Sequence, residues 1–345
     1  MSYLRFINYT DKEGDLYMRN LFLFLLIITS IACTSSTSKR INMPKKEYAI
    51  AIHGGAGVIS KTIPDSIRKN YEAGLKDALD TGVALLKQGK PALEVVEQVI
   101  HKLENNPLFN AGKGAVYTAR GEHELDACIM DGKTLATGAV TGVKTVKSPI
   151  TLARLVMTKT PHVLLMGAGA EEFANEQEIE RVPNTYFDTE TRKKQWERSK
   201  QNHSELDPMF KYGTVGCVVL DKQGNLAAGT STGGMTNKKF GRVGDAPIVG
   251  AGTYANNQTV AVSGTGTGEE FIRNTVASRI AALFEYKDYT VMKASEFVVH
   301  NVLKPGDGGV ICVDKFGNIA MPFNSAGMFR GAADSDGEYH IKIWE

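Results

Sequence analysis

The sequence predicts a layered α+β sandwich, in which hairpins form the sheets and helices cover their faces. Short apolar runs rich in β-branched residues, typical of buried strands, occur in both halves of the chain. Long segments with apolar residues at helical spacing lie between them. The strands come in adjacent groups rather than alternating singly with helices, and this grouping favours α+β over a parallel α/β sheet.

The composition is that of a globular protein with a sizeable core. The chain has 345 residues, of which 42% are hydrophobic and 23% charged, and its formal net charge is +2. These values allow one large domain or two small ones. Because phosphate binding needs a clustered basic face and the chain has no long basic block, nucleic-acid binding is not favoured.

The first half is expected to begin with a buried strand. Residues 48–52 are apolar and run directly into His53-Gly54-Gly55-Ala56-Gly57. Two helices are predicted over 65–88 and 91–105, the second with Pro91 in its first turn. A loop, 106–114, follows them.

Further elements complete both halves. Strands are predicted over 123–130, 137–143 and 162–166, with a helix over 149–157. In the second half, strands are predicted over 214–220, 226–230 and 260–264, a core-facing helix from Glu269, and a closing hairpin over 308–321. Between the halves, residues 175–213 are rich in charge and poor in aliphatic side chains, so we expect an exposed linker there.

The N-terminal region has the pattern of a secretion signal. Residues 18–33 combine a basic start, a short apolar run and small residues at the end, whereas 1–17 look like a non-native extension before the true start at Met18. The run is short for a membrane anchor. Ser30-Ile31-Ala32-Cys33 resembles a bacterial lipobox, although Ser30 stands where Leu is commoner, so cleavage without lipidation of Cys33 stays open. Residues 34–47 then form a tether, and a periplasmic location is expected.

The remaining cysteines do not form a metal or redox motif. Cys128, Cys217 and Cys312 each lie in an apolar run, and no two are spaced as C-x-x-C. Buried free thiols are the simplest interpretation, with a disulfide among them as the alternative.

Several ordered motifs in the second half carry the functional signal. They follow Lys211-Tyr212-Gly213-Thr214-Val215-Gly216-Cys217, where the polar linker stops at a threonine that starts a strand. A lone Gly-Thr would be an ordinary strand residue. The accompanying motifs are Thr230-Ser231-Thr232-Gly233-Gly234, Gly241-Arg242-Val243-Gly244-Asp245, Ser263-Gly264-Thr265-Gly266-Thr267-Gly268-Glu269, and upstream Asn106-Pro107-Leu108-Phe109-Asn110-Ala111-Gly112 and His123-Glu124-Leu125-Asp126-Ala127.

Together these motifs resemble the plant-type L-asparaginase and isoaspartyl peptidase family of Ntn-hydrolases, from residue 48 to the C-terminus. The resemblance implies a four-layer αββα sandwich that cuts itself between Gly213 and Thr214 into an α chain (48–213) and a β chain (214–345). It also implies hydrolysis of β-aspartyl peptides and L-asparagine, with no cofactor in catalysis, and commonly a dimer of αβ units.

The chemistry of an N-terminal threonine fits this implication. A threonine hydroxyl is a poor nucleophile without a base beside it. Cleavage before Thr214 would give that residue an α-amine with a pKa of about 7.7–8.0, a base on the same residue. A glycine at 213 lets the backbone adopt the close geometry that self-cleavage requires.

The resemblance assigns roles to other residues. Thr232 contacts the nucleophile, Thr265 and the amide of Gly266 form the oxyanion hole, and Gly268 contributes a backbone group to the substrate head. Arg242 binds the substrate α-carboxylate, for which a planar guanidinium is suited, and Asp245 binds the α-ammonium. Read singly, Arg242 and Asp245 could equally be a surface ion pair, and residues 265–268 a plain turn or a phosphate site, although no P-loop motif is present.

The loop after the second helix resembles the family's sodium-binding loop, which uses backbone carbonyls. By position, the ligands are the carbonyls of Leu103, Glu104, Asn106, Phe109, Ala111 and Lys113. Carbonyl oxygens suit hard cations, but they leave no side-chain signature, so an ordinary irregular loop is the alternative.

Two rival functions remain. Glycosylasparaginases share much of the second half, but they usually have His-Asp-Thr at the cleavage point and Asn at the position of Thr267. A catalytically inactive lipoprotein that binds amino acids is the other. The presence of Thr214, Thr232, Arg242, Asp245 and Thr265 argues against it.

Overall fold

A computed structural model describes residues 45–201 and 213–345. The predicted extension, signal, lipidation site at Cys33 and most of the tether therefore lie outside the described residues. Within these ranges no helix is long and apolar enough to cross a bilayer.

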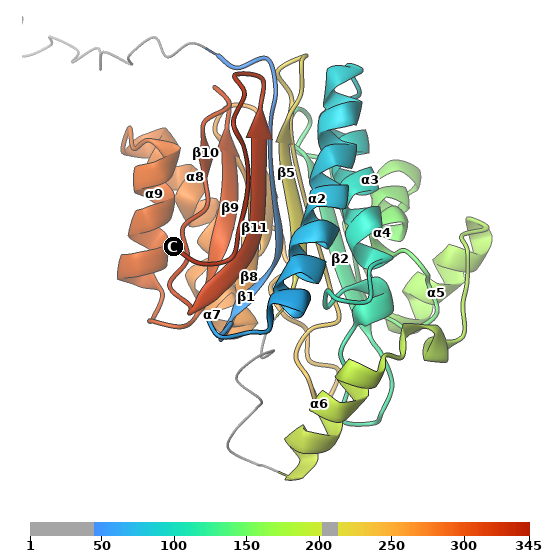
Figure 1. Ribbon diagram of the computed structural model, residues 1–345. Helices are drawn as coiled ribbons and strands as arrows, with labels where there is room; N and C mark the ends of the chain where they lie inside the picture. The colour runs from blue at the N-terminus through green and yellow to red at the C-terminus, as the bar shows by residue number, and fades with distance from the viewer. Residues whose placement is uncertain (1–44, 202–212) are drawn as a thin grey trace, which may run out of the picture. The chain divides into compact units, whose positions relative to one another are not determined.

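Two sheets form the centre of the described chain (Figure 1). The larger has eight strands, in the spatial order β12 (Tyr339–Lys342), β11 (Gly327–Asp334), β1 (Ala49–Gly57), β5 (Val215–Leu220), β6 (Leu226–Thr232), β2 (Leu125–Asp131), β3 (Thr137–Val143) and β4 (Leu164–Met166). The smaller has four, β10 (Ile319–Ala320), β9 (Gly308–Asp314), β8 (Val260–Gly266) and β7 (Thr253–Ala255). The pairings between these named strands are antiparallel except that of β3 with β4.

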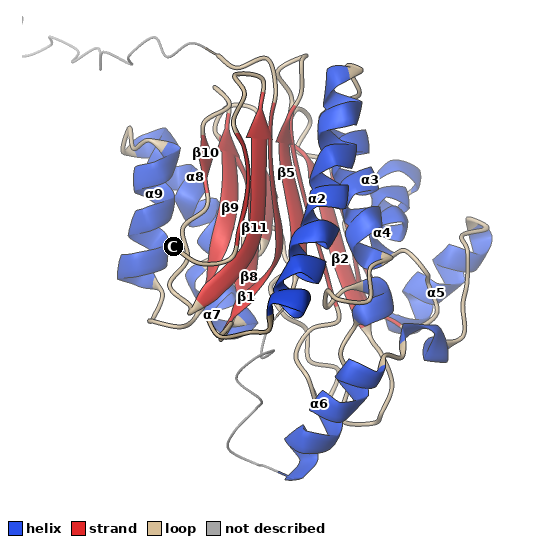
Figure 2. Cartoon of the chain, viewed as in Figure 1, coloured by secondary structure: helices blue, strands red, loops and turns tan. Residues whose placement is uncertain are grey.

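Helices cover the outer face of each sheet (Figure 2). On the large sheet lie α2 (Asp65–Lys87), α3 (Ala92–Glu104) and α4 (Pro149–Lys159), followed along the chain by α5 (Gly167–Glu176) and α6 (Glu190–Gln201). On the small sheet lie α7 (Gly268–Asn274), α8 (Val276–Tyr286), α9 (Val291–Phe297) and a π-helical turn, η4 (Val298–Val302). Short 3₁₀ turns are η1 (Gly112–Gly114) and η2 (Asn184–Phe187).

The alternation of side chains along each strand explains the layering. On β1, Ile50 and Ile52 pack in the core shared with α2 and α3, whereas Ala49 and Ala51 pack in the core shared with the small sheet. Successive side chains of a strand point to opposite faces, so one strand serves both cores. The core between the sheets includes several alanines, among them Ala49, Ala51 and Ala228, together with larger aliphatic side chains. The predicted four-layer αββα sandwich is confirmed.

The predicted linker over 175–213 contains regular structure in its described part, where most residues are exposed or half-buried. This stretch contains η2 and α6, and the side chain of Phe187 is completely buried. Arg192, 5% exposed, donates to the carbonyls of Gly114 and Leu108, so α6 is held against the loop that follows α3. A charged composition does not by itself exclude burial, because backbone carbonyls can accept the hydrogen bonds of a buried guanidinium.

Candidate active site

Thr214 lies at the start of β5, a central strand of the large sheet. The run Val-Gly-Cys-Val-Val-Leu that follows it is buried throughout and pairs with β1 on one side and β6 on the other. Thr214 is itself only 8% exposed. Its hydroxyl donates to the hydroxyl of Thr232, at the end of β6, over 3.2 Å. The structure therefore brings the predicted nucleophile and its predicted partner together.

Glycines make room for the backbone before Thr214. A Cβ at Gly55 would lie 2.6 Å from the Cα of Gly213, and Gly55 has φ of 116°, a value that side-chain-bearing residues rarely adopt. The pairing of β1 with β11 shifts register between His53 and Gly55, a bulge beside the predicted cleavage point. This crowding fixes the path of the chain into Thr214.

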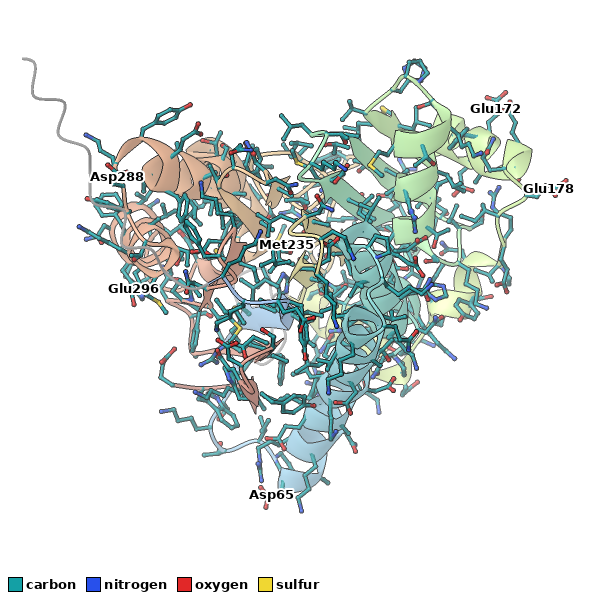
Figure 3. The ribbon with its side chains drawn as sticks, turned by 90° about the horizontal axis from the view of Figure 1, so that it is seen from above. Asp65, Glu172, Glu178, Met235, Asp288 and Glu296 are labelled. Carbon is teal, nitrogen blue, oxygen red and sulfur yellow. The ribbon has the colours of Figure 1, made fainter. Side chains whose placement is uncertain are left out.

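A single pocket collects most of the predicted site residues. Its lining is Gly213, Thr214, Thr232, Gly234, Met235, Arg242, Gly244, Asp245 and Gly266. Met235 lies between the orange helices of the second half and the blue and green helices of the first half (Figure 3). Gly213 is part of the lining, so the bond predicted to be cut and the residues predicted to bind substrate share one space.

The other two residues predicted for catalysis or substrate binding, Thr265 and Gly268, are neighbours of residues that line this pocket. Thr265 is completely buried and its hydroxyl accepts the amide N–H of Ala56 at 3.1 Å, which leaves the hydroxyl hydrogen available to another acceptor. Gly268 lies against Arg242 and Asp245: a Cβ there would be 2.8 Å from Nη2 of the arginine. Any side chain at position 268 would therefore displace the guanidinium.

Asp245 is a buried carboxylate with an unpartnered oxygen. It is 4% exposed, and its Oδ2 has no hydrogen-bond partner among the described residues. Burial is the main cause that raises the pKa of Asp245 to about 7, opposed by its own backbone amide and by Arg242. A buried anion that is not fully paired is costly, so this oxygen favours a bound cation.

Arg242 is already engaged by a carboxylate that sequence reasoning did not single out. Its Nε and Nη2 each donate to one oxygen of Glu269 at 2.9 Å. The isolated Arg242–Asp245 ion pair considered from sequence is not formed, although Asp245 still acts on Arg242 electrostatically. The spacing of Arg242 and Glu269 in the chain gave no sign of this contact.

His53 is a second residue that the sequence analysis left without a role. Its Nδ1 donates to the carbonyl oxygen of Thr214 at 2.9 Å, and its Nε2 lies 2.9 Å from the hydroxyl of Ser263. Since a carbonyl only accepts, Nδ1 carries the hydrogen and Ser263 donates to Nε2. Complete burial lowers the pKa of His53 to about 3, so the ring is neutral. His53 thus holds the backbone of the nucleophile without adding charge.

The contact between His53 and Ser263 depends on the absence of a side chain at Gly216. A Cβ there would lie 2.0 Å from Oγ of Ser263 and 2.3 Å from Nε2 of His53. Gly216→Ala is therefore expected to shift Thr214 and to slow turnover by about 10²-fold, since misplacement by an ångström has that order of effect. Steady-state kinetics measures this. The control is Gly169→Ala, where a Cβ meets nothing within 4 Å; equal rates in both variants would contradict the inference.

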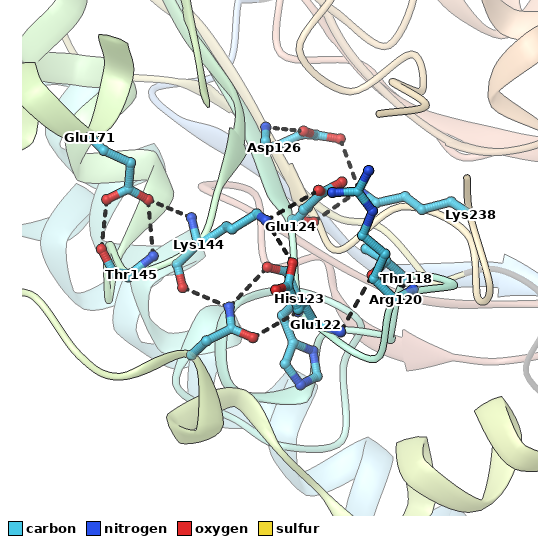
Figure 4. A network of polar contacts seen from close by, with 12 residues as sticks. Thr118, Arg120, Glu122, His123, Glu124, Asp126, Lys144, Thr145, Glu171 and Lys238 are labelled. Atoms are coloured by element: carbon cyan, nitrogen blue, oxygen red, sulfur yellow. Dashed lines mark hydrogen bonds and ion pairs between the residues drawn. The ribbon is translucent and has the colours of Figure 1, made fainter. Parts of the chain in front are cut away.

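Asp126 and Lys238 belong to a network of polar contacts (Figure 4). Asp126 on β2 is paired in register with Thr232 and accepts from Thr141 and the amide of Gly142. Its second oxygen is 4.0 Å from Nζ of Lys238, which is buried and donates to the carbonyl of Glu124. This pair fixes the loop after β6, which carries Met235 into the pocket.

The loop expected to bind sodium packs tightly on itself. The carbonyl oxygen of Glu104 would be 2.4 Å from a Cβ at Gly112, and that of Phe109 would be 2.1 Å from a Cβ at Gly114. Both positions therefore need glycine, because any side chain there would collide with the backbone of the loop. Among the described residues no group of three or more His, Cys, Asp or Glu side chains could hold a metal ion. The three described cysteines are buried and free.

Curated proteins of known name resemble this chain over most of its length. The isoaspartyl peptidase of Salmonella typhimurium is 52% identical over 292 residues, which cover 81% of this chain and 93% of that protein. The isoaspartyl peptidase of Escherichia coli is 50% identical, over 81% of this chain and 91% of that protein. The isoaspartyl peptidase/L-asparaginase of Mus musculus is 43% identical, over 81% and 86%.

A family model agrees with these relatives and with the resemblance seen in the motifs. The model described as asparaginase matches residues 46–343, nearly all of the described chain. The matched range contains both sheets, the pocket and the predicted cleavage point. The chain belongs to the asparaginase family of Ntn-hydrolases.

Proposed function

We propose that this protein is an isoaspartyl peptidase and L-asparaginase that cuts itself before Thr214 and then uses Thr214 as an N-terminal nucleophile. The observation that carries the proposal is the single pocket in which Thr214 and Thr232 lie beside Arg242 and Asp245. The pocket combines a nucleophilic hydroxyl, a guanidinium and a carboxylate. This set suits a substrate whose α-amino and α-carboxylate groups are both free. The names of the relatives agree with this chemistry.

Self-cleavage would use the same hydroxyl as hydrolysis. Oγ of Thr214 attacks the carbonyl carbon of Gly213, the acyl group moves from nitrogen to oxygen, and water hydrolyses the ester. The products are a carboxylate on Gly213 and a free amine and hydroxyl on Thr214. The hydrogen bond from His53 to the carbonyl of Thr214 holds the residue in place during the shift.

Hydrolysis of substrate then proceeds through an acyl-enzyme. The α-amine of Thr214 takes the hydroxyl proton as Oγ attacks the side-chain amide carbon, and the proton passes to the leaving amine. Thr265 and the amide of Gly266 donate to the developing oxyanion, a type of contact worth about 10²–10³ in rate per donor. Water finally releases aspartate and restores Thr214.

The head of the substrate would be recognised by charge. Arg242 binds the α-carboxylate, Asp245 binds the α-ammonium through its unpartnered Oδ2, and Gly268 keeps the space between them open. Ammonia or an amino acid leaves from the other end, so asparagine and β-aspartyl dipeptides both fit. Nothing in the comparisons favours the glycosylasparaginase alternative, and the complete residue set disfavours an inactive binding protein.

The direct test is kinetics on the purified, processed enzyme. We expect release of aspartate from L-asparagine and from a β-aspartyl dipeptide, with little from a glycosylated asparagine. Activity confined to the glycosylated substrate would favour the alternative. Binding of these molecules without turnover would favour the inactive binding protein.

The raised pKa of Asp245 predicts how substrate binding depends on pH. A pKa of about 7 means that the carboxyl is protonated below this pH and cannot pair with an ammonium. Affinity for L-aspartate, measured by calorimetry, is therefore expected to fall as the pH is lowered from about 8 to about 6. The Asp245→Asn variant should bind L-aspartate weakly, and its affinity should not change between about pH 8 and about pH 6. The same step in that variant would assign the titration to another group.

Three further features are proposed on sequence grounds. The loop 103–113 would hold a structural sodium ion, and exchanging sodium for choline should then lower the melting temperature while leaving kcat nearly unchanged.

Two αβ units would form a dimer, which light scattering measures. Export to the periplasm, with or without a lipid on Cys33, would be tested by the mass of the mature N-terminus and by Cys33→Ser.

A further inference from the structure

We infer that Glu269 is a positioning residue that turns Arg242 toward the substrate carboxylate. This inference rests on the proposed function, because it concerns how the proposed carboxylate-binding arginine is oriented. Glu269 follows Gly268 in the first turn of α7, and it is not among the residues that line the pocket. It therefore acts through Arg242 rather than on substrate.

Glu269 occupies one edge of the guanidinium completely. Nε and Nη2 of Arg242 each donate to a separate carboxylate oxygen over 2.9 Å, a bidentate pair. Such paired contacts fix the plane of a guanidinium as well as its position. Burial works to lower the pKa of Arg242, but the hydrogen bonds and charge of Glu269, together with the charges of Asp245 and Asp126, outweigh it and raise the pKa. The arginine therefore remains charged in a largely enclosed position.

The free nitrogen of the guanidinium, Nη1, lies beside a glycine that lines the pocket. A Cβ at Gly244 would lie 2.8 Å from Nη1 of Arg242, and Gly244 lines the pocket. A Cβ at Gly268 would lie 2.8 Å from Nη2 and 3.0 Å from Oδ1 of Asp245. The guanidinium is thus placed with Nη1 toward the substrate space and Nη2 between Glu269 and Asp245. A substrate carboxylate would be met by the Nη1 side, not by the Nε–Nη2 fork that a free arginine would offer.

Holding the arginine in advance reduces the cost of binding. A free arginine side chain has many rotamers, and ordering it when substrate arrives weakens binding. The side chains of Arg242 and Glu269 are 18% and 41% exposed, so solvent reaches the pair and an unpaired arginine could turn toward it. The chemistry at Thr214 is not touched by this contact, so the effect belongs to substrate binding.

Glu269→Gln is expected to raise KM for L-asparagine about tenfold and to change kcat by less than about threefold, because one charge-assisted pair is lost outside the reacting atoms. Self-cleavage, which needs no substrate carboxylate, should proceed to the same extent. The control is Glu270→Gln on the same turn of α7; Glu270 pairs with Arg273 instead. Its kinetics should match the unaltered enzyme.

A substrate analogue separates positioning from general structural damage. In L-aspartic acid diamide an amide replaces the α-carboxylate, so the effect of Glu269→Gln on KM should largely disappear. In an Arg242→Ala background, Glu269→Gln should likewise add little, since the two changes remove one interaction. Both results would support the inference.

Three results would overturn it. These are an unchanged KM in Glu269→Gln, an equal rise in KM for asparagine and for the diamide, and full additivity with Arg242→Ala. A failure of the proposed function would look different, because the unaltered enzyme would then hydrolyse neither asparagine nor a β-aspartyl dipeptide.

Discussion

Thr214→Ala should leave the chain whole and lower hydrolysis of L-asparagine by about 10⁵-fold, because one hydroxyl serves as nucleophile in both reactions. Alanine retains a small buried side chain at the start of β5, so the fold should persist. A denaturing gel and steady-state kinetics on the same preparation measure the two effects together.

The matched control for this variant is Thr137→Ala. Thr137 is also 8% exposed and lies on the large sheet, in β3, but its hydroxyl donates to the carbonyl of Leu135 away from the pocket. This control should cleave itself and turn over normally. If Thr214→Ala still separated into two chains, an outside protease would be responsible for the cleavage.

Arg242→Ala should raise KM for L-asparagine by about 10²-fold with a smaller change in kcat, because the only cation lining the pocket among the described residues is lost. Self-cleavage should continue, since Gly213 and Thr214 present no carboxylate to Arg242. The prediction separates binding from chemistry: the same pocket should still process itself while failing to hold substrate.

Arg154→Ala is the control for loss of a salt-bridged arginine. Arg154 pairs with Glu97 between α4 and α3, outside the pocket. Its removal should leave KM unchanged. Arg242→Lys should fall between wild type and Arg242→Ala, because an ammonium keeps the charge but cannot make the bidentate pair with Glu269. An unchanged KM in Arg242→Ala would remove this residue from the binding site.

Much of the fold could be predicted from local patterns. The strand that begins after Gly213, the helices near 65–88 and 91–105, and the hairpin near 308–321 all agree with the structure. Each has a strong period or a continuous β-branched run, which local sequence shows directly. The family resemblance extended these elements to the correct four layers.

Local patterns could not predict the contacts between segments that lie far apart in the sequence. β11, Gly327–Asp334, was left unassigned although it pairs with β1 inside the large sheet. Its sequence, Gly-Met-Phe-Arg-Gly-Ala-Ala-Asp, has little β-branching and a buried arginine, so only its position makes it a strand. The helix α6 was not predicted either, because its charged sequence shows no apolar period.

The site shows the same division. Thr214, Thr232, Arg242 and Asp245 stand in motifs, and the structure brings all four into one pocket. Glu269 and His53 stand in motifs too, but their roles arise from contacts with Arg242 and with the carbonyl of Thr214. The pairing of β1 with β5 brings His53 to Thr214, and the start of α7 brings Glu269 to Arg242; no spacing in the sequence encodes either contact.

N-terminal sequencing of the purified, active protein tests the central claim most directly. A base and a nucleophile on one residue require a free amine on Thr214. We predict one chain whose sequence begins Thr-Val-Gly-Cys. An active preparation in which no chain begins at Thr214 would contradict the account.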